Sequence, residues 1–253
     1  MHELCLFSKP IRVEQPSTQQ KKVQSLPPSR YCGGEMLIPW AVEVRDLSKR
    51  YGPRWAVAGL SFNLAPGHSL LLTGPNGSGK TTLLKLLAAS LRPTSGDIKI
   101  FGVDPRSDLE GARRKTALLS HANHLYDGLT ARENLQLMAG FLGPGDFREK
   151  VEPLLEKVGL ASRAENPVSQ FSAGMKKRLG IARMLLKSPP VILLDEPFGE
   201  LDPPGIKQME QIINQLRISG VCLILATHLI EQGRALCDRQ LELSEGRSTD
   251  GSQ

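Results

Sequence analysis

The feature that most constrains the fold is a glycine-rich segment, Gly-Pro-Asn-Gly-Ser-Gly-Lys-Thr, at residues 74–81. It matches the pattern G-x-x-x-x-G-K-[ST] and lies between the apolar run Leu70–Leu72 and the helix-forming run Thr82–Leu87. A strand, a glycine loop and a helix in this order surround an anion with main-chain N–H groups and the positive end of a helix. An ordinary glycine turn does not account for this eight-residue pattern in register with these flanks. The segment therefore predicts a site for the phosphates of a nucleoside triphosphate.

Each residue type in this loop has an expected role. Glycines let the backbone turn with its N–H groups pointing inward, where a side chain would collide with phosphate. Lys80 is expected to reach the β- and γ-phosphates, and the Thr81 hydroxyl is expected to hold Mg²⁺. The candidate binding residues are Gly74, Pro75, Asn76, Gly77, Ser78, Gly79, Lys80, Thr81 and Thr82.

Composition places few limits on function. The net charge of +6, from 32 basic and 26 acidic residues, is compatible with nucleic acid or an anionic membrane surface, but equally with an ordinary solvated surface. No run approaches about 18 consecutive apolar residues, so we expect no transmembrane helix and only a peripheral membrane role. The cysteines lack C-x-x-C spacing, which favours reduced thiols of a cytosolic protein over disulfides or a zinc site. They are Cys5, Cys32, Cys222 and Cys237.

The pattern along the chain divides it into three segments. Residues 1–39 are rich in Gln, Ser, Pro and Lys without helical or strand periodicity, so we expect a disordered extension, with Met36 as a candidate start. Residues 40–240 have an α/β pattern without an internal repeat, which predicts a single nucleotide-binding domain. Residues 241–253 are expected to form a flexible tail.

Two kinds of strand are predicted in the α/β segment. Ala41–Val44 and Gly96–Ile100 alternate apolar and polar residues, as antiparallel edge strands do. Val191–Leu194 and Val221–Leu225 are continuously apolar, which is typical of strands buried on both faces of a parallel sheet.

Helical patterns dominate residues 122–175, and we expect a helical subdomain there. Ala131–Phe141 and Phe147–Val158 are the predicted helices, separated by the Gly-Pro-Gly sequence at residues 143–145.

Acidic residues follow the buried strand Val191–Leu194. Because ligands bind beyond the C-terminal ends of parallel strands, Asp195 is expected to bind Mg²⁺ through water, and Glu196 to polarise the attacking water. A solvated acidic turn is the alternative, and the glycine loop argues against it. His228, after the next strand, could contact the γ-phosphate and hold that water, although a lone histidine after a strand is more often a surface residue. Glu196, His228 and Lys80 are the candidate catalytic residues.

A third segment, Phe171–Arg178, opens the predicted helix Lys176–Leu186. Ser172 and Gly174 resemble a helix cap with an exposed backbone, which suits an anion. Taken alone, however, the segment is better explained as a plain N-cap.

With these motifs in order, residues 40–240 resemble the ATP-binding subunit of ABC transporters. Gly74–Thr81 matches that family's Walker A loop, Val191–Glu196 its Walker B strand and glutamate, and His228 its switch histidine. The resemblance implies an α/β fold of the P-loop NTPase class in its ABC ATPase form. A mixed-sheet core would carry an antiparallel β subdomain and a helical subdomain.

Other motifs of the family are present in altered form. The sequence FSAGM at residues 171–175 is similar to the signature LSGGQ, and it keeps Ser172 and Gly174, the two residues that face phosphate in the family. Asp202 within GELD matches the D-loop, and Tyr51 lies where the family stacks an aromatic ring on adenine. These four residues are therefore further candidates for nucleotide binding.

One departure concerns the glutamine that the family places at the start of its helical region. His121 stands at that position, so its contact with Mg²⁺ is in doubt, while a link to the helical region is still expected. Together with LYDGLTARENL at residues 125–135 and FSAGMKKRLGIARMLL at residues 171–186, this histidine is similar to the haem exporter ATPases of bacterial cytochrome c maturation.

The resemblance implies a peripheral ATPase at the cytoplasmic face of the cell membrane that uses ATP and Mg²⁺. It would form a head-to-tail homodimer, contact an integral membrane permease subunit through residues 121–142, and bind no nucleic acid. A generic drug- or lipid-export ATPase remains an alternative to haem export. A soluble ABC-type ATPase acting on ribosomes or DNA lacks support, because such proteins usually carry two cassettes or long insertions. A non-hydrolysing regulator would not need Glu196 and His228.

Overall fold

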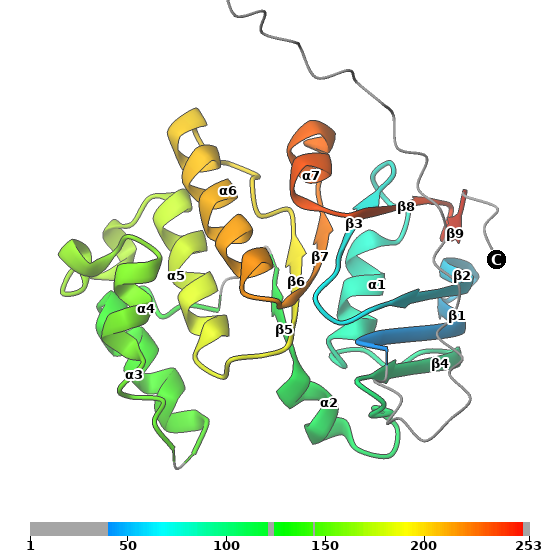
Figure 1. Cartoon of the computed structure of the whole chain (residues 1–253), viewed down its shortest axis with the longest axis horizontal. Helices are drawn as coiled ribbons and strands as arrows, with labels where there is room; N and C mark the ends of the chain where they lie inside the picture. Colours follow the sequence, from blue (N-terminus) through cyan, green and yellow to red (C-terminus); the bar gives the residue numbers. More distant parts are fainter. Residues whose placement is uncertain (1–39, 121–123, 144, 250–253) are drawn as a thin grey trace, which may run out of the picture. The chain divides into compact units, whose positions relative to one another are not determined.

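The computed structural model describes residues 40–120, 124–143 and 145–249 (Figure 1). The extension expected at residues 1–39, with the candidate start at Met36, lies outside the described residues, as does His121. Among the residues that are described, no helix combines the length and the apolar character needed to cross a membrane.

A six-stranded main sheet forms the centre of the described chain, in the order β5-β6-β7-β3-β8-β9. The first five strands in this order are parallel, and β9 pairs antiparallel with β8. The bounds are β3 (Ser69–Thr73), β5 (Thr116–Leu119), β6 (Val191–Asp195), β7 (Cys222–Ala226), β8 (Arg239–Ser244) and β9 (Arg247–Ser248).

The continuously apolar strands are buried on both faces of this sheet, as predicted. Alternate residues of a strand point to opposite faces. In β6, Ile192 and Leu194 pack into one hydrophobic cluster, whereas Val191 and Leu193 pack into the other. Both faces of the strand therefore require apolar side chains, which explains why the sequence does not alternate.

A small antiparallel sheet covers part of one face. It has the order β2-β1-β4, with β1 (Val42–Tyr51), β2 (Arg54–Leu64) and β4 (Ser95–Ile100). Helix α1 (Lys80–Leu87) lies between the two sheets and buries four leucines in the cluster that they share (Figure 1). The mixed main sheet with an antiparallel subdomain confirms the expected fold class.

Helices cover the other face and extend away from it. The capping box of Thr130 and Glu133 starts α3 (Ala131–Phe141) at the predicted residue. Helix α4 (Val151–Lys157) begins later than Phe147, because the N–H groups of Glu149 and Val151 make turn-type bonds to carbonyls three residues earlier. The other helices are α2 (Leu109–Lys115), α5 (Ala173–Leu185), α6 (Pro203–Ile218) and α7 (Ile230–Leu236), with 3₁₀ turns at Ala161–Arg163 and Val168–Gln170.

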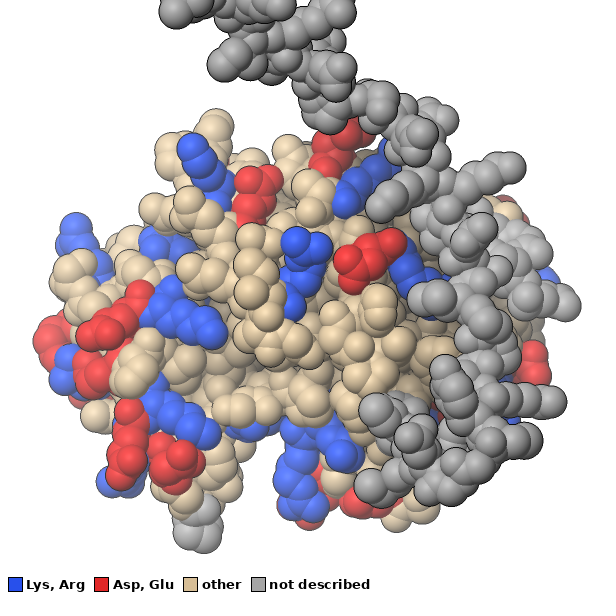
Figure 2. All heavy atoms as spheres, viewed as in Figure 1, with Lys and Arg blue, Asp and Glu red and all other residues tan. Residues whose placement is uncertain are grey.

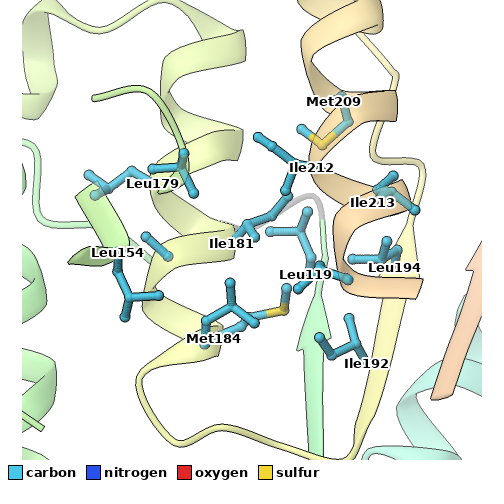
Figure 3. Packing of buried hydrophobic residues seen from close by; sticks show 14 of the residues in the cluster. Leu119, Leu154, Leu179, Ile181, Met184, Ile192, Leu194, Met209, Ile212 and Ile213 are labelled. Carbon is cyan, nitrogen blue, oxygen red and sulfur yellow. The ribbon is translucent and has the colours of Figure 1, made fainter. Parts of the chain in front are cut away.

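Helix α5 joins the α3–α4 region to the main sheet. Figure 3 shows Leu179, Ile181 and Met184 of α5 among side chains from α4, α6, β5 and β6. Because protein interiors are close-packed, a shift of α5 would displace the residues at the end of β6.

The expected flexible tail at residues 241–253 is wrong for its first part. Strand β8 continues to Ser244, and Leu243 is fully buried. The alternation of apolar and polar residues from Leu241 to Ser244 is a strand pattern, and this strand pairs with β3 and β9 in the main sheet. The ordered domain therefore continues past residue 240, while residues 250–253 lie outside the description.

Candidate functional site

The register of the main sheet brings the predicted site residues to one edge. Leu72 of β3 and Asp195 of β6 both pair with Ala226 of β7, so these three strands end at the same level. The chain beyond each end lines a cleft of about 460 Å³. The lining residues are Ala56, Asn76, Gly77, Ser78, Gly79, Lys80, Thr81, Thr82, Asp195, Glu196, Gly199 and His228.

Two glycines of the loop are needed because other backbone lies against them. A Cβ on Gly74 would lie 2.0 Å from the Leu243 carbonyl oxygen, and one on Gly79 would lie 2.1 Å from the Ala56 carbonyl oxygen. Gly79 also has a φ of +108°, which L side chains rarely adopt. The N–H of Gly246 also donates to the carbonyl oxygen of Ser78 at 3.1 Å. Residues 243–246 therefore support the loop.

The Lys80 side chain folds back over the loop. Its amine donates to the carbonyl oxygens of Gly74 at 2.7 Å and Pro75 at 3.0 Å. Burial lowers the pKa of this amine, and the nearby carboxylates of Glu196 and Asp195 oppose the shift. The amine therefore lies between the loop and the acidic pair, where it can meet an anionic ligand.

Asp195 and Glu196 have different environments although they are adjacent. Asp195 is the last residue of β6 and is buried. Glu196 adopts a φ of +51° at the turn that follows, and its N–H donates to the Ala226 carbonyl oxygen at 2.9 Å. Both residues line the cleft, Asp195 from the end of the strand and Glu196 from the turn that follows it.

His228 lies beside Glu196. Its main-chain N–H donates to Glu196 Oε2 at 3.3 Å, and its Nε2 lies 3.3 Å from Glu196 Oε1. Oε1 is buried and has this contact with His228 Nε2 but makes no hydrogen bond within the described part of the chain. Ser78 Oγ is buried and has no hydrogen-bond partner among the described residues. A buried hydroxyl without a partner at the cleft indicates that a polar ligand belongs there.

The donor set fits a magnesium–triphosphate complex. Mg²⁺ prefers oxygen ligands and is usually held by one or two carboxylates together with substrate phosphates. The Thr81 hydroxyl and the Asp195 carboxylate supply such oxygens in the cleft. Among the described residues, no group of three or more His, Cys, Asp or Glu side chains could hold a metal ion.

The third predicted segment, Phe171–Arg178, contributes no residue to the lining of the cleft. Ser172 is the N-cap of α5, and its Oγ accepts a hydrogen bond from the Met175 N–H at 3.2 Å. Gly174 lies in the first turn, because the helix starts three residues before the predicted Lys176. Ser172 is exposed, and neither residue lines the cleft. The chain thus carries a second candidate anion-binding element outside the first.

Two further candidates are also outside the cleft lining. Tyr51 is 51% exposed at the end of β1, opposite Arg54 and close in register to the cleft residue Ala56. Asp202 is the N-cap of α6, where its carboxylate accepts from the Gly205 N–H at 3.1 Å.

Three residues near the cleft were not found from the sequence. Ala56 and Gly199 line it, and Lys177 donates from α5 to the carbonyl oxygen of Glu196 at 3.0 Å. Lys177 lies within the signature-like segment, but no local pattern indicates a contact with a residue 19 positions later.

Comparisons with known proteins agree with this geometry. A family model described as ABC transporter matches residues 57–199. A Nod factor export ATP-binding protein of Burkholderia thailandensis is 38% identical over 208 residues, covering 81% of this chain and 68% of that protein. A lantibiotic transport ATP-binding protein of Streptococcus pyogenes is 36% identical over 198 residues, covering 78% of this chain and 84% of that protein.

Solved structures give the same result. A dimeric ATP-binding cassette in a post-hydrolysis state, bound to ADP and phosphate, superposes with a TM-score of 0.75 at 27% identity, covering 82% of this chain and 96% of that chain. An ATP-binding subunit of an ABC transporter superposes with a TM-score of 0.74 at 31% identity, covering 82% and 88%.

Proposed function

Because the chain belongs to the ABC transporter family as an ATP-binding subunit with ATPase activity, we propose that two copies pair head to tail to power a separate membrane subunit. The observation that carries this proposal is the separation of the two anion-binding elements, the cleft at Lys80 and the exposed cap at Ser172. A two-fold axis would place the cleft of each copy against the cap of the other, so that one dimer completes two sites.

Within each proposed site, the residues of the cleft divide the chemistry. The N–H groups of residues 76–81 and the Lys80 amine bind the phosphates, and Mg²⁺ held by Thr81 and Asp195 would neutralise developing charge on the phosphate oxygens. Glu196 accepts a proton from the attacking water, and His228, 3.3 Å from Glu196, orients it. Tyr51 would stack on adenine, and Asp202 is a further candidate for nucleotide binding.

A complementation experiment tests the head-to-tail pairing. Lys80→Ala disables the cleft, and Ser172→Arg blocks the cap with a bulky side chain. In a mixed dimer of the two variants, one site carries both defects, and the other site is intact. We therefore expect each variant alone to be inactive, and an equal mixture to recover about a quarter of the wild-type ATPase rate. Failure of the mixture to recover activity, while the wild type hydrolyses ATP as a strict monomer, would overturn the pairing.

The contact with the membrane subunit is proposed at residues 121–142, on the cytoplasmic face of the membrane. Large apolar side chains are exposed in this stretch, Tyr126 at 55% and Phe141 at 71%. Aromatic side chains are enriched in protein–protein interfaces, so their exposure here supports a protein contact. Basic and acidic side chains are intermixed over most of the face in Figure 2, which gives no support to a nucleic-acid partner.

Export is the direction that the named relatives support. The names of those relatives give Nod factor and lantibiotics as their cargo, and these names do not identify the cargo of this chain. Haem export rests on His121 and the two sequence runs that follow it. Purifying the chain with its membrane subunit and measuring ATPase stimulation by haem, a lipid or a peptide in vesicles distinguishes these cargos. Lack of stimulation by any membrane partner, with specific ribosome or DNA binding instead, would refute the transporter assignment.

A further inference from the structure

Lys177 occupies an unusual position for a lysine. It lies in the second turn of α5, five residues after the Ser172 cap, and is only 6% exposed. Its amine donates to two main-chain carbonyl oxygens of the turn after β6, those of Glu196 at 3.0 Å and of Gly199. A buried ammonium group is costly unless it is hydrogen-bonded, so this contact constrains both helix and turn.

The turn at residues 196–199 presents two carbonyl oxygens to the Lys177 amine. The Gly199 N–H also donates to the Glu196 carbonyl oxygen, at 3.2 Å, which closes the turn, and the carbonyl oxygens of both residues accept from the Lys177 amine. A Cβ on Gly199 would lie 3.3 Å from the Lys177 amine, which leaves little room for a side chain there. Burial lowers the pKa of Lys177, and the Glu200 and Glu196 carboxylates oppose that shift.

We propose that Lys177 is a positioning residue for ATP hydrolysis, which holds the main chain of Glu196 in the conformation that aims its carboxylate into the cleft. The backbone of Glu196 needs such a restraint, because a φ of +51° is unfavourable for a residue with a side chain. The restraint comes from the helix that begins at Ser172. This inference rests on the proposed role of Glu196 and on the head-to-tail pairing.

One consequence is a mechanical link between the two sites of a dimer. In the proposed pairing, Ser172 of a chain faces the nucleotide of the other copy, while Glu196 of the same chain serves its own nucleotide. Lys177 connects these two ends through a short path of five helix residues and two hydrogen bonds. Occupancy of one site then influences the position of the general base in the other.

The neighbouring lysine provides a matched control. Lys176 precedes Lys177 on the same helix, but its amine pairs with Asp127 at 2.8 Å, away from the turn at residues 196–199. Lys176→Met therefore removes the same functional group from the same helix without touching the turn. We expect its turnover number to stay within about twofold of the wild type, as for other surface substitutions.

The test uses mixed dimers, because they show which Glu196 is affected. The working site in the mixture of Lys80→Ala and Ser172→Arg chains uses Glu196 of the Ser172→Arg chain. Lys177→Met added to that chain should lower the rate about tenfold or more, since small displacements of catalytic groups have effects of this size. Added to the Lys80→Ala chain, whose Glu196 is idle, it should have a much smaller effect. Lys177→Arg, which keeps the donor, should recover part of the loss.

The outcomes separate the possible causes. An equal loss on both chains would mean that Lys177 supports the fold in general, and no loss on either would mean that it has no role; both results overturn the proposal. If the mixture without a change at Lys177 is inactive and the wild type hydrolyses ATP as a strict monomer, the pairing is wrong. The turnover number of Lys177→Met in the otherwise wild-type protein, at unchanged ATP affinity, then decides on Lys177 alone. Lys177→Gln replaces Lys177→Met in each arm if the methionine variant does not fold.

Discussion

Replacing Glu196 by Gln removes one charge from the cleft and leaves the packing around it intact. The N–H of Glu196 donates to Ala226, its carbonyl oxygen accepts from Lys177, and its side chain accepts from the His228 N–H. Each of these bonds can form with Gln as well, because an amide oxygen accepts as a carboxylate does. We therefore expect the free energy of unfolding to change by less than about 1 kcal/mol.

The expected effect on hydrolysis is much larger. An amide does not accept a proton from the attacking water, and general-base catalysis typically contributes about 10²- to 10⁴-fold. We expect single-turnover hydrolysis to slow by about 100-fold or more, equivalent to about 3 kcal/mol on the barrier. Lys80 and Asp195 remain in the cleft, so ATP binding is retained and a closed, ATP-bound dimer should accumulate.

The assay compares single-turnover hydrolysis of radiolabelled ATP with ATP affinity by calorimetry and with dimer formation by size exclusion. Glu200→Gln is the matched control, because Glu200 is an exposed carboxylate only four residues further along the chain. It should hydrolyse ATP at the wild-type rate. Wild-type turnover by Glu196→Gln with unchanged ATP affinity would refute the role of Glu196 as general base.

Three further predictions concern the phosphate loop and the Cys237 thiol, which lies between α7 and β8. Lys80→Ala should remove most of the affinity for ATP, as measured by calorimetry. Lys85→Ala, on the exposed side of the same helix, should leave the affinity unchanged. Undiminished ATP binding by Lys80→Ala would contradict the assignment of the phosphate loop. Gly77→Ala should lower the free energy of unfolding in urea by about 1–2 kcal/mol, because this residue has a positive φ. Gly79→Ala should lower it clearly more, because its Cβ would also lie 2.1 Å from the Ala56 carbonyl oxygen. Equal losses of stability in the two variants would show that this close approach is absent. Burial raises the pKa of the Cys237 thiol to about 12, so its contribution to stability is present below pH 9 and is lost as the pH rises from 9 towards 12. Iodoacetamide at pH 9 should therefore modify Cys237 in urea but not in the folded protein, and peptide mapping that finds rapid modification of the folded protein would disprove the shift.

Local sequence was sufficient wherever a function depends on neighbouring residues. The phosphate loop at residues 74–81 is one continuous segment whose glycines, lysine and flanks act together, so its pattern predicted its conformation. Helix α3 begins where its capping box stands, and the apolar run of β6 predicted a strand buried on both faces. In each case the physical cause depends on residues within about ten consecutive positions. This cause is a backbone angle, a helix cap or a buried face.

Contacts between distant segments were decided only by tertiary structure. The closeness of Leu243 to Gly74 makes the second part of strand β8, which was expected to belong to a flexible tail, part of the support of the loop. The bond from Lys177 to the carbonyl of Glu196 depends on how α5 packs against the end of β6, and the exposure of Ser172 depends on where that helix begins. Side-chain periodicity shows which face of an element is buried, but the partner that covers that face is chosen by the packing of the whole domain.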